Sequence, residues 1–220
     1  MAVKISKTGK LDGIRSWSLQ AIETCPSAHA GDGNLVEVCQ GCYATEGHYR
    51  MRNVKDVRSH NKEDWKRDGW VGGMIDALDT DRYFRWFDSG DIYHPRLAIK
   101  ILEVVQRTPW CKHWIPTRSH KIDRIRPILE AIHAEPNAVV RYSSDSINEY
   151  TPGVHGSVVV TADAVPDGVT ICRAYDTKPA RCNGCRACWD KSVGTIGYIA
   201  HGHSMARTLK RKDGYFDIAA

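Results

Sequence analysis

The 220-residue sequence contains no apolar stretch that approaches the length needed to cross a membrane. Its N-terminal segment, MAVKISKTGK, also lacks the apolar region of a secretory signal peptide. These two absences predict a cytoplasmic protein with no membrane partner. In a reducing cytosol, its eight cysteines are expected to be metal ligands or reactive thiols rather than disulfides.

The sequence also lacks the motifs of several common function classes. It has no phosphate-cradling P-loop, no zinc-finger spacing and no aromatic RNA-binding signature. Neither a Ser–His–Asp order nor a Gly-x-Ser-x-Gly elbow occurs, so hydrolase chemistry has no support. The net charge is +5, and its basic residues are spread along the chain, for example in residues 50–66 and 207–212. We interpret them as solvated surface, with a nucleic-acid-binding patch as the alternative.

No repeat, low-complexity segment or linker interrupts the chain, so we predict a single domain over residues 1–220. Strand-like and helix-like segments alternate, which is typical of an α/β fold. Helices are expected after Pro95 and over residues 122–132, where Pro127 is a candidate kink. Strands are predicted at residues 16–19, 82–87, 114–115, 138–142, 157–160, 169–172 and 195–199.

These strands predict a mainly parallel sheet that is buried on both faces by helices. The carboxyl ends of parallel strands gather at one edge, and α/β proteins bind their ligands there. We therefore expect a site at this edge. Its candidate residues are the polar side chains that follow the strands: Asp88, Asp91, Thr117, Arg118, Ser119, Ser143, Ser144, Asp145 and Asp163.

Four cysteines in the C-terminal part form the pattern C-x9-C-x2-C-x2-C: Cys172, Cys182, Cys185 and Cys188. Two-residue gaps let neighbouring thiolates reach different corners of one cluster, which is the local rule of 4Fe-4S ligation. A single tetrahedral zinc ion suits three thiolates within so short a segment less well. The pattern favours an iron–sulfur cluster, with zinc, redox or structural thiols as the alternatives.

A second group, Cys25, Cys39 and Cys42, has the spacing C-x13-C-x2-C and precedes a helix predicted from about Tyr43. Three cysteines can bind three irons of a cubane and leave the fourth open to a small ligand. The alternatives are a zinc pair completed by a distant ligand, a thiol pair at a helix N-terminus, or one cluster that draws on both ends of the chain. Cys111 is expected to be a buried small hydrophobe.

The segment CQGCYA resembles the GC-x-x-CYA segment of radical-SAM-like proteins found in phage genomes. Together and in order, SWSL, TCP, CYATEG, RWFDSGDI, PTRS and the closing C-x2-C-x2-CW resemble the phage family named after gene product eighty-eight, over residues 16–189. The resemblance implies a partial (β/α) barrel of the radical-SAM type with one or two 4Fe-4S clusters. It also implies a phage-encoded protein in the host cytoplasm.

The same resemblance implies roles for particular residues. The N-terminal cysteine group would bind the cluster at which S-adenosylmethionine (SAM) is cleaved to a 5′-deoxyadenosyl radical. Gly90 and Asp91 stand where such proteins have a Gly–Gly–Glu-like segment that contacts the methionine amino group. Arg118 and Ser144 are further candidates for this SAM pocket. The C-terminal group would bind an auxiliary cluster.

The residues leave three hypotheses open. The first is an iron–sulfur protein on a radical-SAM-like scaffold, which would need a ferredoxin- or flavodoxin-like electron donor and would act on a small molecule or a macromolecule. The second is a non-catalytic iron–sulfur protein for electron transfer or structure, and the third a zinc-stabilised module that binds nucleic acid. His201 and His203 share one loop and are expected to face solvent.

Overall fold

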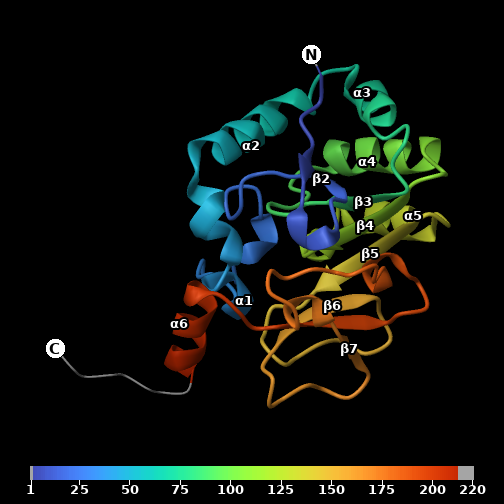
Figure 1. Ribbon diagram of the computed structural model, residues 1–220. Helices are drawn as coiled ribbons and strands as arrows, with labels where there is room; N and C mark the ends of the chain where they lie inside the picture. The colour runs from blue at the N-terminus through green and yellow to red at the C-terminus, as the bar shows by residue number, and fades with distance from the viewer. Residues whose placement is uncertain (1, 213–220) are drawn as a thin grey trace.

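The computed structural model describes residues 2–212 of the chain, and its strands form one sheet of eight. The strands are β1 (Ser6–Lys7), β2 (Arg15–Trp17), β3 (Tyr83–Trp86), β4 (Lys112–Thr117), β5 (Ala138–Ser143), β6 (Gly156–Val160), β7 (Val169–Ile171) and β8 (Thr195–Ile199). The α-helices are α1 (Glu37–Gln40), α2 (Arg52–Asp64), α3 (Trp70–Ala77), α4 (Pro95–Arg107), α5 (Arg126–Ala134) and α6 (His203–Lys212). Figure 1 shows α2 and α3 at the top of the molecule, β6 and β7 at the bottom, and α6 beside α1.

The strand order is β1-β2-β3-β4-β5-β6-β8-β7, and only β1 runs antiparallel to its neighbour. The prediction of an α/β fold with a mainly parallel sheet is therefore confirmed, and β1 is the one strand that the sequence did not predict. In the described part of the chain, the sheet has two ends, at β1 and β7. The finer prediction was a partial barrel. Strand order alone does not distinguish a partial barrel from an open sheet.

Helices α4 and α5 each have a proline in their first turn. Pro95 occupies the first turn of α4, and the His94 ring accepts a hydrogen bond from the Arg96 N–H as its cap. Pro127 likewise lies in the first turn of α5, so it starts this helix and does not kink it. The helix predicted from Tyr43 is delayed to Arg52, after two 3-10 turns.

The helices α3, α4 and α5 pack against one face of the sheet, where Phe84, Trp86, Ile115 and Val140 join them in the main core. Residues on a strand alternate between faces. Arg85, Trp114 and Pro116 accordingly lie on the opposite face, where they line a cavity. The expectation that helices bury both faces is therefore wrong for this region of the sheet.

Candidate functional site

The cavity has a volume of about 460 Å³ and lies at the carboxyl ends of β3, β4 and β5. Six of the eight cysteines line it: Cys25, Cys39, Cys42, Cys172, Cys182 and Cys188. The other two differ from each other. Cys111 is fully buried in the main core, as predicted, whereas Cys185 is exposed. Residues from both ends of the chain thus bring their thiols to one site.

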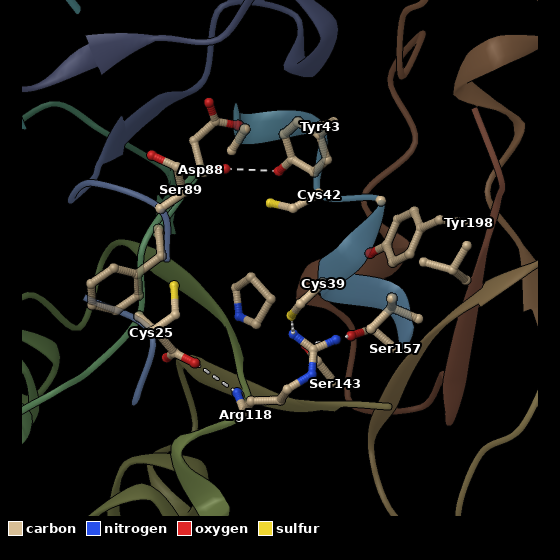
Figure 2. A pocket seen from close by; sticks show the side chains of 18 of the residues that line it. Cys25, Cys39, Cys42, Tyr43, Asp88, Ser89, Arg118, Ser143, Ser157 and Tyr198 are labelled. Atoms are coloured by element: carbon tan, nitrogen blue, oxygen red, sulfur yellow. Dashed lines mark hydrogen bonds between the residues drawn. The ribbon is translucent and has the colours of Figure 1, made fainter. Parts of the chain in front are cut away.

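A loop of 13 residues joins Cys25 to Cys39, and it folds back on itself to bring the two together. His29 and Leu35 form an antiparallel bridge, and the Val36 N–H donates to the Ala28 carbonyl at 2.9 Å. Cys39 then lies in α1 and Cys42 just beyond it. Figure 2 shows Cys25, Cys39 and Cys42 around the same hollow, with Arg118 reaching Cys39.

Burial has the largest effect on the pKa of each of these three thiols. It raises the pKa of Cys25 to about 12, and negative charge at Asp91 adds to the effect. Burial also raises the pKa of Cys39 and of Cys42, while the Arg118 guanidinium opposes the shift at both. The metal-free thiols are therefore protonated at neutral pH, and a metal that binds them must displace their protons.

Asp91, the predicted SAM contact, links two strand ends. Its carboxylate accepts hydrogen bonds from the Thr117 hydroxyl at 2.6 Å, the Arg118 N–H at 2.8 Å and the Ile92 N–H at 2.7 Å. It lines the cavity, but both of its oxygens are engaged within the protein. Asp91 thus fixes the turn after β3 to the turn after β4.

Gly90 allows the same turn to approach the N-terminal segment closely. Its φ is +76°, in the left-handed region, and a Cβ atom here would lie 2.6 Å from the Cβ of Leu19 and 2.6 Å from the hydroxyl oxygen of Thr24. The Asp91 N–H also donates to the Thr24 carbonyl at 3.1 Å. This contact holds the segment that leads to Cys25 against the end of β3.

Arg118 connects Cys39 to the end of β5. Its guanidinium donates to the Cys39 sulfur at 3.4 Å and to the Ser144 carbonyl at 2.6 Å, and it pairs with Asp145 at 3.2 Å. Most of the predicted polar edge thus meets at the cavity. Asp88, Asp91, Thr117, Arg118, Ser143 and Ser144 line it, Ser119 is buried beside it, Asp145 pairs with Arg118, and the exposed Asp163 lies outside it.

The C-terminal cysteine group reaches the cavity from its other side. Burial raises the pKa of Cys182 to about 11, and charges on Cys172 and Cys188 raise it further. The Cys188 sulfur lies 3.4 Å from the Tyr198 hydroxyl. Of the four cysteines that the sequence grouped together, the structure brings three to the cavity and leaves Cys185 outside.

Several residues at the site were not predicted from the sequence. Arg85 pairs with Asp88 at 2.6 Å, donates to the Tyr43 hydroxyl at 3.3 Å and lies over the Trp114 ring. Lys10 lies over the Tyr175 ring with its Nζ 4.0 Å from the ring centroid. The alternation of β3 could have placed Arg85 opposite Phe84 and Trp86, but no local pattern singles out Lys10.

His203 is exposed, as was expected for both histidines, whereas His201 is half-buried and belongs to the cavity lining. Its Nε2 lies 2.6 Å from the Tyr175 hydroxyl and its Nδ1 lies 2.8 Å from the Ile199 carbonyl. Since a carbonyl only accepts, Nδ1 carries the proton and Nε2 accepts from Tyr175. The pair forms a hydrogen-bonded chain at the cavity wall.

Two findings concern the part of the chain that the structure describes. No three side chains from His, Cys, Asp and Glu form a group that could hold a metal ion as they stand. No helix within residues 2–212 has the length and apolar character to span a membrane.

The fold and the cavity define an α/β protein whose parallel strands end at a cysteine-lined site. The chain belongs to the Gene product 88 family, whose model matches residues 2–191. This confirms the family that the sequence resembles, and the match includes every cysteine of the cavity. Searches among curated proteins and among solved structures gave no match.

Proposed function

We propose that this protein binds 4Fe-4S clusters at two cysteine groups on a radical-SAM-like scaffold and uses the N-terminal group in SAM-dependent radical chemistry. The observation that carries the proposal is the shared cavity, in which Cys25, Cys39 and Cys42 meet polar residues at the carboxyl ends of β3, β4 and β5. Active sites of (β/α) barrels lie at this edge of the sheet.

The arrangement of strands and helices supports the scaffold. The parallel strands β2 to β6 are neighbours in chain order, and α3, α4 and α5 pack on one face of the sheet. Barrels keep their helices on the outside, whereas doubly wound sheets carry them on both faces. The cysteine-lined cavity lies on the face that would be the barrel interior.

The donor set supports a cluster. Thiolates are the protein ligands of 4Fe-4S centres, and each binds a different iron, so the ligands stand around a volume rather than around one point. The N-terminal group surrounds part of the cavity in this way, with three thiols from a loop, from α1 and from the turn beyond it. When bound, such a cluster supplies the single electron on which SAM cleavage depends.

The protein's own residues would position and shield this chemistry. Arg118 donates to the Cys39 sulfur and would stabilise it as a thiolate. Ser144 and Gly90 line the cavity and remain the candidates for contacts with SAM, while Asp91 holds the turns that present them. Catalysis would also require a one-electron donor, for which a ferredoxin- or flavodoxin-like protein is suited.

The test is iron and acid-labile sulfide content after anaerobic purification, with EPR of the dithionite-reduced protein before and after SAM is added. We expect about eight irons per chain, two cubanes of four, and a signal that changes with SAM. Cys39→Ala should abolish the SAM response, whereas Cys111→Ala, far from the cavity in the main core, should retain it. Stoichiometric iron without any response to SAM would instead support the non-catalytic iron–sulfur protein, and zinc without iron would refute both.

A further inference from the structure

The four C-terminal cysteines do not share one environment. Cys172, Cys182 and Cys188 line the cavity and are partly buried, whereas Cys185 is exposed. The three cavity thiols lie near one another. Cys182 and Cys188 pack against the same apolar cluster, which contains Leu11 and Trp189. The Cys172 N–H donates to the Gly197 carbonyl of β8 at 2.8 Å, beside Tyr198, whose hydroxyl lies 3.4 Å from the Cys188 sulfur.

The backbone of the loop accounts for the outward position of Cys185. The Cys182 N–H donates to the Lys10 carbonyl at 2.9 Å, which fixes the start of the loop against the N-terminal segment. Asn183 and Gly184 follow in left-handed conformations, with φ of 46° and 80°. The Cys185 N–H then donates a hydrogen bond to the Cys182 carbonyl at 2.9 Å, which closes a tight turn.

Asp12 holds this turn from outside. Its carboxylate accepts from the Asn183 N–H at 3.2 Å, the Gly184 N–H at 3.0 Å and the Arg186 guanidinium at 3.0 Å. These contacts fix the backbone of the turn that presents Cys185 outside the cavity. The sequence spacing alone carries no information about them.

Lys10 lines the cavity together with the three remaining thiols. Its Nζ lies 5.9 Å from the ring centroid of Tyr198, and the hydroxyl of that tyrosine lies 3.4 Å from the Cys188 sulfur. None of the ion pairs among the described residues includes Lys10, and its ammonium lies over the Tyr175 ring. A cluster held by three thiolates would carry negative charge beside this ammonium group.

We propose that the C-terminal metal site is a three-cysteine site, formed by Cys172, Cys182 and Cys188 with Lys10 beside them, and that Cys185 is not a ligand. This inference rests on the proposed function and refines it. A 4Fe-4S cluster bound in this way has one iron without a protein thiolate, so both cysteine groups of the cavity would be open to small ligands.

The experiment compares Cys185→Ala with Cys182→Ala in the full chain, purified anaerobically, by iron and sulfide content. We expect Cys185→Ala to keep the wild-type content and Cys182→Ala to lose about half of it, one cubane of two. Thermal unfolding of both metal-free variants checks that they fold alike. If Cys185→Ala loses as much iron as Cys182→Ala, the inference is wrong, while the proposed function stands.

A second measurement does not depend on substitution. The metal-loaded protein is treated with iodoacetamide, and its modified cysteines are identified by mass spectrometry before and after chelation. Cys185 should be modified in the loaded protein, and Cys172, Cys182 and Cys188 only after chelation. Protection of Cys185 in the loaded protein would overturn the inference, and a wild-type protein without any bound metal would overturn the proposed function itself.

The role of Lys10 is tested with Lys10→Met. Lys7→Met is the control, because Lys7 is exposed in β1. We expect Lys10→Met to lose iron to a chelator faster than the wild type and Lys7→Met to lose it at the wild-type rate. Equal rates for all three proteins would refute the role of Lys10.

Discussion

At the scale of single residues, His113 shows how burial fixes a protonation state. Its side chain is fully buried, its Nδ1 accepts from the Trp86 indole at 3.1 Å, and its Nε2 lies 2.9 Å from the Thr108 hydroxyl. That hydroxyl donates to the Val104 carbonyl, so Nε2 carries the proton. A second proton on Nδ1 would face the indole N–H. Burial accordingly lowers the pKa of His113 to about 3.

This histidine predicts a pH dependence of stability. Below pH 6.5, the ordinary pKa of histidine, the unfolded chain takes up a proton that folded His113 refuses until about pH 3. The free energy of unfolding should therefore fall as the pH is lowered through this window, by about 1.4 kcal/mol per pH unit for this one group. Urea unfolding between pH 7 and pH 5 measures the slope. His113→Gln should make it shallower, and an unchanged slope would contradict the role of this histidine.

Arg141 is the second residue whose role depends on burial. Its guanidinium is inaccessible to solvent and donates to the carbonyls of Ala187, Cys188, Asp190, Val193 and Gly194. Arg141→Met should lower the free energy of unfolding by about 3 kcal/mol, because it leaves several buried carbonyls without donors. Chemical denaturation measures this. Arg124→Met, at an exposed position, should change it by less than about 0.5 kcal/mol.

At the scale of elements, two glycines in different settings give opposite predictions. Gly90→Ala should destabilise the protein by about 2 kcal/mol or more, since it combines a left-handed φ with contacts of 2.6 Å to Leu19 and Thr24. Gly72 lies inside α3, and no atom beyond its chain neighbours and the backbone of its own helix lies within 4 Å of an added Cβ, so Gly72→Ala should stabilise by about 0.5–1 kcal/mol. Thermal or urea unfolding of the two variants measures both changes in the free energy of unfolding. A neutral Gly90→Ala would show that the turn after β3 is free to move.

The helix α6 packs against the N-terminal cysteine group. A Cβ on Gly41 would lie 2.9 Å from the Cα of Met205, and the Glu46 carboxylate accepts from the Ser204 N–H at 3.1 Å and pairs with Arg207. Met205 is buried in one apolar cluster with Val38 and Cys39.

Ending the chain at Gly202 should therefore expose the N-terminal group. In the metal-free protein, we expect Cys39 to be alkylated by iodoacetamide faster than in the full chain. Cys111, buried in the main core, should react equally slowly in both. An unchanged rate at Cys39 would mean that the rest of the apolar cluster suffices to cover it.

At the scale of the whole molecule, the cavity joins parts of the chain that are far apart in sequence. Residues 8–49 and 172–205 enclose it from both ends, and β3, β4, β5 and β6 contribute to its wall. Metal centres bound at the two cysteine groups would therefore stabilise the folded state against the unfolded chain. Removal of metal by a chelator should lower the temperature of unfolding, and Cys39→Ala and Cys182→Ala should each lower it in part, as differential scanning calorimetry would show. An identical unfolding temperature with and without metal would argue against metal binding at either cysteine group of the folded protein.

The sequence by itself determined most of the sheet. Seven of the eight strands were predicted because apolar, β-branched and aromatic runs mark buried strands, and only the two-residue β1 was missed. It also determined that polar residues gather at the carboxyl ends of the strands, because parallel strands point the same way. The family was identified from ordered motifs, which are local in the chain.

Only the tertiary structure decided which thiols share a site. Spacing grouped Cys185 with Cys182 and Cys188, but the left-handed turn and the Asp12 contacts, which span more than 170 residues of sequence, direct it outwards. Lys10 and His201 reach the cavity through long-range packing that leaves no local pattern. The spacing of cysteines in the sequence shows which thiols of one loop could bind the same metal centre. Where that loop lies in the fold depends on hydrogen bonds to distant parts of the chain.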